Sequence, residues 1–153
     1  LYLGGEDSVP ETAYAIAPGK ARIVRTGSDC TVVATMAMVE RAVQAARKLE
    51  DQGLSVEVID PRTIKPLDTA TLIESIKKTG RAVVVHEAPR FGGIGGEIAA
   101  TLMEEAFDWL DAPVRRIGAP EMPVPYDDRL ERQYLPDANR IADAVLDVCY
   151  VAR

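Results

Sequence analysis

Residue types that build metal-binding or reactive sites are scarce in this chain of 153 residues. It has one histidine, His86, and two cysteines, Cys30 and Cys149, with no CxxC pair. A structural zinc site needs about four such ligands at short spacings, so the sequence argues against a bound metal. We interpret the two cysteines as small buried apolar residues in a reducing compartment.

Long apolar runs and an excess of positive charge are also missing. No stretch is long enough to span a membrane, and the first residues lack the charged and apolar parts of a signal peptide. The net charge of −6 disfavours non-specific binding to nucleic acid and to anionic membranes, but it leaves basic protein partners open. Because the chain begins with Leu1, we expect it to be part of a longer protein.

The chain does contain an alternation of apolar strands and amphipathic helices. Residues 1–19 show no period and are punctuated by glycine and proline, so we predict a linker or arm there and one domain over residues 20–153. Residues 27–29 form a short turn, which favours antiparallel pairing of the strands on either side. From β-branched or continuous apolar runs, strands are predicted at 21–25, 30–35, 55–60, 82–87 and 114–118.

Helices are predicted between and after these strands. Apolar residues at helical spacing indicate one from about Val39 to Leu49. Asp68 is a suitable cap for a second, which Gly80 ends. Two more are predicted at about 94–110, with Phe107 in the core, and at about 137–148. This order indicates an α/β domain with a mostly parallel sheet and one antiparallel edge strand.

Prolines concentrate in the loops that follow the third, fourth and fifth predicted strands. Ligands and partners of parallel α/β sheets meet the loops at the carboxyl ends of the strands. Proline fixes φ and lowers the entropy lost on ordering, so we interpret this edge as a stiffened contact surface. The prolines are Pro61, Pro66, Pro89, Pro120, Pro123 and Pro125.

The stretch "HEAPRFGGIGGE" (residues 86–97) resembles several functional motifs, and none is complete. Arg90 stands where the zinc signature H-E-x-x-H needs its second histidine, and Pro89 breaks the required helix. Ile98 replaces the third glycine of a dinucleotide fingerprint. No serine, cysteine or threonine adjoins His86. We therefore predict neither a catalytic residue nor a metal ligand in this chain.

Four glycines, Gly92, Gly93, Gly95 and Gly96, are interpreted as a tight turn from strand to helix. A small-anion site at the helix N-terminus is the alternative. His86 is either a hydrogen-bonded residue at the end of a buried strand or a proton donor or substrate contact at a neighbouring active site. We expect valine at Gly95 or Gly96 to destabilise the fold and alanine at His86 to have little effect.

Several long segments resemble the C-terminal, transketolase-like domain of the beta subunit of 2-oxo acid dehydrogenases, in the order of that family. They are "VPETAYAIAPGKARIVRTGSDCTVV", "MVERAVQAARKLEDQGLSVEVIDPRTIKPLDTATLIESIKKTGRAVVVHEAP", "GGIGGEIAATLMEEAFDWLDAPVRRIGAPEMPVPY" and "LERQYLPDANRIADAV". The chain departs from the family at Pro61, where leucine is commoner, and at Glu121 and Met122, where aspartate and threonine are common. The "HEAP" spelling favours the branched-chain type, and pyruvate and acetoin types stay open.

The resemblance implies a three-layer α/β/α fold with a mostly parallel five-stranded sheet. It also implies a parent enzyme that decarboxylates a 2-oxo acid on thiamine diphosphate with Mg²⁺, both bound outside this chain, and then acylates a lipoyl group. Expected partners are an alpha subunit and a second beta subunit (α2β2), together with the subunit-binding module of the dihydrolipoyl acyltransferase. The expected compartment is the cytoplasm of a bacterium or the mitochondrial matrix of a eukaryote.

Site residues follow from the same resemblance. His86, Glu87 and Arg90 are expected at a subunit interface or an active-site channel. Residues 121–147 hold seven acidic and three basic residues, and Glu121, Asp127 and Asp128 are the candidates for docking a basic acyltransferase module. The alternatives are the C-terminal domain of a single-chain transketolase or deoxyxylulose phosphate synthase, and a non-enzymatic anion-binding or regulatory module.

Overall fold

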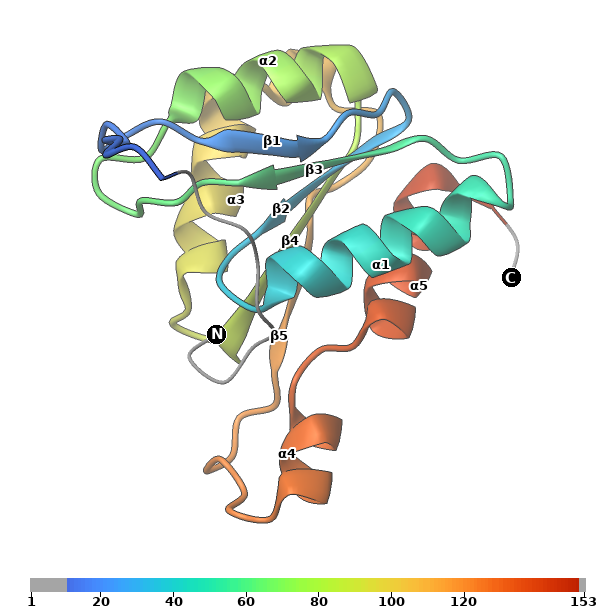
Figure 1. Ribbon diagram of the computed structural model, residues 1–153. Coiled ribbons are helices and arrows are strands. Elements are labelled where there is room, and N and C mark those ends of the chain that lie inside the picture. Colours follow the sequence, from blue (N-terminus) through green and yellow to red (C-terminus); the bar gives the residue numbers. More distant parts are fainter. Residues whose placement is uncertain (1–10, 152–153) are drawn as a thin grey trace.

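A computed structural model describes residues 11–151, in which helices cover both faces of one five-stranded sheet (Figure 1). The strands are β1 (Arg22–Arg25), β2 (Cys30–Ala34), β3 (Val56–Asp60), β4 (Ala82–Pro89) and β5 (Arg115–Ala119). The helices are α1 (Met38–Glu50), α2 (Thr69–Thr79), α3 (Ile94–Glu105), α4 (Asp128–Tyr134) and α5 (Ala138–Cys149), with a 3₁₀ turn at Phe107–Trp109. The predicted α/β/α fold is confirmed.

The predicted linker lies partly outside the described residues. Residues 1–10 fall there, and residues 11–19 contain no helix or strand. The boundary at residue 19 therefore stays a prediction.

The sheet has the strand order β1-β3-β2-β4-β5. Strand β2 runs parallel to both β3 and β4, β5 runs parallel to β4, and β1 alone is antiparallel. The antiparallel edge strand is thus confirmed, but the expected pairing of the first two strands is wrong, because β1 pairs with β3.

The turn between β1 and β2 explains this pairing. The backbone N–H groups of Ser28 and Asp29 donate to the carbonyl of Ser55, at 3.0 and 2.8 Å, and the Asp29 carboxylate accepts from the Ser55 N–H at 2.7 Å. A Cβ on Gly27 would lie 2.2 Å from the backbone nitrogen of Glu57. The turn therefore crosses over the start of β3 and places β1 on its far side, and only glycine allows so close a crossing.

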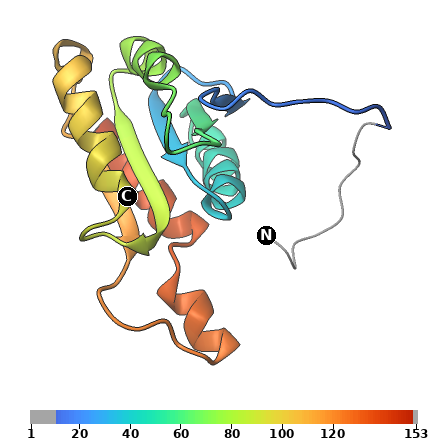
Figure 2. The same cartoon turned by 90° about the vertical axis from the view of Figure 1, so that its left-hand side faces the viewer.

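Two apolar clusters hold the layers together. One joins β2, β3 and β4 to α1 and α5, and the other joins the opposite face of the sheet to α2 and α3. Figure 2 shows the sheet nearly edge-on between these helices. Strand β2 is buried along its whole length, because a central parallel strand contacts helices on both faces.

The caps of α2 are those expected from the sequence. The Asp68 carboxylate accepts from the Thr71 N–H at 3.3 Å and the Thr71 hydroxyl at 2.8 Å, and also from the Ala21 N–H at 2.9 Å. Gly80 ends the helix with φ of 67°, in the left-handed region that glycine adopts without strain. Asp68 thereby ties the start of α2 to the chain that enters β1.

Two helices differ from the prediction. Helix α3 ends at Glu105 rather than near residue 110, because Ala106 leaves helical geometry with φ of −133°. Phe107 is 63% exposed and is not the core residue expected. Helix α4 falls in a segment predicted to be a proline-rich loop.

A buried polar network lies between β3 and α2. Glu57 is only 1% exposed, and its carboxylate accepts from the Ser75 hydroxyl at 2.5 Å and from the Lys78 ammonium. The Gly27 N–H donates to the same carboxylate at 3.3 Å. Ser75 also shares a hydrogen bond of 2.6 Å with the buried Thr31 hydroxyl. Every polar group of this network has a partner, as a buried carboxylate requires.

Candidate functional site

His86 lies inside the domain, on the face of β4 that is covered by α3. It is 2% exposed. A Cβ on Gly93 would lie 2.4 Å from the ring atom Cε1, and a Cβ on Gly95 would lie 2.6 Å from Cδ2 and Nε2. The first turn of α3 therefore rests directly on the imidazole. His86 is a core residue of this domain, and its substitution is expected to affect stability, contrary to the expectation from sequence.

The electrostatic environment of His86 favours the neutral ring. Burial lowers the pKa of His86; the Ala88 backbone acts in the opposite direction, and the charge of Arg116 lowers it further. Neither ring nitrogen has a hydrogen-bond partner of good geometry among the described residues. The close approach of Gly93 and Gly95 to the buried ring fits a packing role.

The four glycines of the loop have different roles. Gly92 has φ of 69°, where glycine is favoured, and Gly93 and Gly95 permit the approach to His86. A Cβ on Gly96 would meet only the end of the Arg116 side chain, at 3.4 Å. The space beside Gly93 and Gly95 is filled by the imidazole, so the turn offers no room for a phosphate there.

The three candidates at the end of β4 do not form one site. His86 faces α3, whereas the Glu87 carboxylate accepts from the Ala37 N–H at 3.2 Å, at the start of α1 on the opposite face. A carboxylate suits this position because helix N-termini carry unpaired N–H groups and partial positive charge. Arg90 is exposed and lies next to β5.

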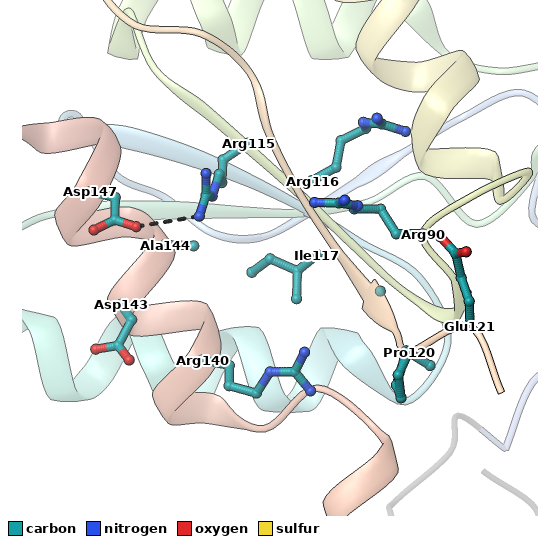
Figure 3. Close-up of a pocket in the computed structure, with 12 residues that line it drawn as sticks. Arg90, Arg115, Arg116, Ile117, Pro120, Glu121, Arg140, Asp143, Ala144 and Asp147 are labelled. Carbon is teal, nitrogen blue, oxygen red and sulfur yellow. Dashed lines mark ion pairs between the residues drawn. The ribbon is translucent and has the colours of Figure 1, made fainter. Parts of the chain in front are cut away.

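A pocket of about 460 Å³ opens beside β5 and the facing side of α5 (Figure 3). Arg115 on β5 pairs with Asp147 on α5 at 3.7 Å. Arg90 extends across β5 toward this space, and Arg140 enters it from α5. The pocket brings together Arg90 and Glu121 of the predicted site residues. It is lined by Arg90, Arg115, Arg116, Ile117, Gly118, Ala119, Pro120, Glu121, Arg140, Asp143, Ala144 and Asp147.

Asp127 and Asp128 lie away from this pocket, at the start of α4. The Asp127 carboxylate accepts from the N–H groups of Arg129 and Leu130, at 2.9 and 3.4 Å, and caps the helix. The hydrogen bond from the Arg129 backbone is the main cause of the lowered pKa of Asp127. Asp128 is exposed in the first turn. Asp127 thus has a local structural role whether or not it meets a partner.

The segment between β5 and α5 exposes apolar side chains, whereas the sequence pattern had indicated only its prolines. Residues 120–136, here called the α4 arm, project from the sheet in both views (Figures 1 and 2). Several large apolar side chains are exposed on the arm: Met122, Val124, Tyr126 and Leu130. Tyr134 is instead buried, and its hydroxyl donates to the Met122 carbonyl at 3.2 Å. The alternation of Met122, Val124 and Tyr126 with prolines is the sequence pattern that could have predicted this exposed apolar surface.

The described residues contain no group of three or more histidine, cysteine, aspartate or glutamate side chains that could hold a metal ion. Among the same residues, no helix is long and apolar enough to cross a membrane. The site consists of an arginine-rich pocket at a sheet edge and a projecting arm, which suits recognition of a partner.

Residues 19–141 match the family described as "Transketolase, C-terminal domain". Pyruvate dehydrogenase E1 component subunit beta from Rickettsia felis is 46% identical over 150 residues, which are 98% of this chain and 46% of that protein. Acetoin:2,6-dichlorophenolindophenol oxidoreductase subunit beta from Bacillus subtilis is 42% identical over 140 residues, 92% of this chain and 41% of that protein.

The chain therefore spans less than half the length of these two relatives. A solved structure described as a split gene transketolase, inactive beta4 tetramer, matches with a TM-score of 0.79 and 30% identity, over 97% of this chain and 47% of that one. The match of residues 19–141 and the shared fold identify this chain as a member of the transketolase C-terminal domain family.

Proposed function

We propose that this chain is the C-terminal domain of the beta subunit of a thiamine-diphosphate-dependent 2-oxo acid dehydrogenase. The observation that carries the proposal is the similarity to pyruvate- and acetoin-type beta subunits over nearly the whole chain. Neither relative is of the branched-chain type favoured by the "HEAP" spelling, so pyruvate comes first as the 2-oxo acid, and acetoin, a hydroxyketone, is the alternative substrate. The compartment is the bacterial cytoplasm, or the mitochondrial matrix in a eukaryote.

The residues that the structure describes around the glycine-rich turn do not fit thiamine diphosphate and Mg²⁺. The described part of the chain offers no cluster of ligands for the metal, and His86 fills the space beside the glycine-rich turn. In the proposed enzyme the cofactor, which supplies the decarboxylation chemistry, is held by parts of the subunits outside this chain. This domain contributes assembly and partner recognition rather than a catalytic residue.

Two surfaces support an assembly role. Strand β5 is an edge strand, whose outer N–H and C=O groups have no neighbouring strand in the described sheet. The α4 arm exposes Met122, Val124, Tyr126 and Leu130 close together in sequence, and exposed apolar groups of this kind mark protein interfaces. We propose that an alpha subunit and a second beta subunit, in an α2β2 assembly, cover the β5 edge and these apolar side chains and leave the acids of the arm exposed.

Docking of the acyltransferase is proposed at the acidic side chains around the arm. Glu121 lies at the pocket beside β5, and Asp127 and Asp128 begin α4. A basic subunit-binding module would meet these carboxylates, and their charge would mainly raise the association rate. Exposed ion pairs are screened over about 8 Å at physiological ionic strength, so binding is expected to weaken as salt rises.

Activity of the whole assembly tests the first proposal. The full-length beta subunit, assembled with its alpha partner, thiamine diphosphate and Mg²⁺, is assayed against pyruvate, acetoin and branched-chain 2-oxo acids. Turnover of pyruvate or a branched-chain 2-oxo acid, with acyl transfer to a lipoyl domain, supports the proposal, whereas turnover of acetoin alone would indicate an acetoin-cleaving relative. Transketolase activity without 2-oxo acid turnover would favour the second candidate, a two-subunit transketolase, which the match to the split gene transketolase suggests.

Docking is tested separately by titrating the acyltransferase module against the same assembly at low and high salt. The double change Asp127→Lys and Asp128→Lys is compared with Glu104→Lys and Glu105→Lys, which change equally exposed acids at the end of α3. Only the first pair is expected to slow association. Equal effects of the two pairs, or binding that does not respond to salt, would place the dock elsewhere.

A further inference from the structure

The fold brings together two cysteines that lie at opposite ends of the chain. Cys30 begins β2 and is fully buried, and Cys149 ends α5 and is partly exposed; both are free thiols. The Cys149 thiol donates to the Asp29 carbonyl at 3.9 Å, and that carbonyl belongs to the peptide bond that joins Asp29 to Cys30. Cys149 also packs against the apolar cluster that contains Cys30.

The two thiols differ in burial and in pKa. Interaction with the Cys30 thiol lowers the pKa of Cys149, and the charge of Arg81 does the same, whereas burial and Asp29 act in the opposite direction. The Arg81 guanidinium donates to the Asp29 carbonyl at 3.4 Å, beside the Cys149 thiol. The pKa of Cys30 is raised well above its ordinary value, first by Cys149 and then by burial. Cys149 therefore combines the lowered pKa with the greater exposure to solvent.

We propose that Cys149 is a peroxide-sensitive thiol and that Cys30 resolves its oxidised form into an intramolecular disulfide. A partly exposed thiol of lowered pKa beside a second thiol is the arrangement that redox-sensing cysteines use. Nothing in the sequence pattern indicated it, since the two residues form no CxxC motif.

The chemistry needs only a hydroperoxide as oxidant. The Cys149 thiolate attacks one peroxide oxygen, so that an S–O bond forms while the O–O bond breaks. The departing hydroxide takes the proton released by Cys149 and leaves as water. The Cys30 sulfur then attacks the sulfenic sulfur; an S–S bond forms, the S–O bond breaks, and the hydroxide takes the Cys30 proton. Two thiols lose two electrons in total, and one hydrogen peroxide becomes two molecules of water.

The disulfide would join the central strand of the sheet to the last helix. Strand β2 lies between β3 and β4, and α5 packs on α1 and forms one wall of the pocket beside β5. A link across so long a segment of chain restricts the unfolded state strongly. Oxidation would therefore hold α5, with Asp143 and Asp147, in place against the sheet.

The test is a titration of the reduced full-length beta subunit, assembled with its alpha partner, with hydrogen peroxide near neutral pH. Remaining thiols are alkylated after unfolding, and the products are followed by intact mass and peptide mapping. The thiols of Cys30 and Cys149 are expected to disappear together, with one peptide pair linked through these two residues within a single beta subunit. Dithiothreitol should restore both thiols, and the oxidised chain should melt at a higher temperature than the reduced chain.

Variants assign the roles of the two cysteines and of the nearby charge. In Cys30→Ala, Cys149 should accumulate as sulfenic and then sulfinic acid, whereas in Cys149→Ser the buried Cys30 should stay reduced. Arg81→Gln should slow the oxidation of Cys149 several-fold, and Arg25→Gln, which changes another partly exposed arginine paired with an acid, should not. If the unaltered chain gives only a sulfinic acid at Cys149, links between molecules, or no reaction, the proposal is wrong.

Discussion

The contact between His86 and the first turn of α3 leads to a quantitative prediction for two adjacent glycines. Gly95 and Gly96 both lie in this turn, so replacing either with alanine changes helix propensity by a similar amount, a gain of up to about 1 kcal/mol. The new Cβ at Gly95 would lie 2.6 Å from two atoms of the imidazole, whereas that at Gly96 would lie 3.4 Å from the end of a flexible arginine. Only the first substitution overpacks the core.

The cost of that overpacking can be bounded. His86 is 2% exposed, so its ring cannot swing into solvent, and forcing extra volume into a packed core costs about 1–3 kcal/mol. Because the propensity gain cancels in the comparison, Gly95→Ala should be about 1–3 kcal/mol less stable than Gly96→Ala. For a protein of this size that corresponds to a separation of roughly 2–12 °C in Tm.

Denaturant unfolding of the two variants measures this difference. A second comparison isolates the contact itself. In a His86→Ala background the imidazole is gone, and Gly95→Ala should then cost no more stability than Gly96→Ala. If the two alanine variants are equally stable with His86 present, the close packing of α3 on the imidazole is refuted. If the difference persists without the imidazole, another neighbour causes it.

Three further predictions concern the buried polar groups. Burial lowers the pKa of His86 below its unfolded value of about 6.5, so the unfolded chain binds more protons at lower pH. The free energy of unfolding should therefore fall as the pH drops below about 6.5. In thermal melts at several pH values, His86→Gln should remove this part of the pH dependence. Asp68→Ala should cost about 1–2 kcal/mol through loss of the α2 cap, whereas Asp51→Ala, at an exposed helix end, should change stability little. Glu57→Ala should lower the free energy of unfolding by about 2 kcal/mol or more, because it breaks a buried network. Glu74→Ala, at an exposed position, should lower it by about 0.5 kcal/mol or less. Urea unfolding of both variants measures the difference.

Local patterns in the sequence account for most of the elements and for the family. Asp68 and Gly80 mark the ends of α2 because a carboxylate cap and a left-handed glycine act through bonds to their own helix. The continuous apolar run of β4 indicates a strand buried on both faces. These signals lie within a few residues of the structure that they specify, so one sequence is enough to find them.

Contacts between distant segments were decided only by the tertiary structure. The turn at Gly27 favoured pairing of β1 with β2, but hydrogen bonds to Ser55 carry β1 across to β3. Packing of α3 makes His86 a core residue rather than a rim contact, and packing of α5 brings Cys149 to Cys30. The spacing of residues along the chain does not predict such contacts, because they depend on how the helices pack on the sheet.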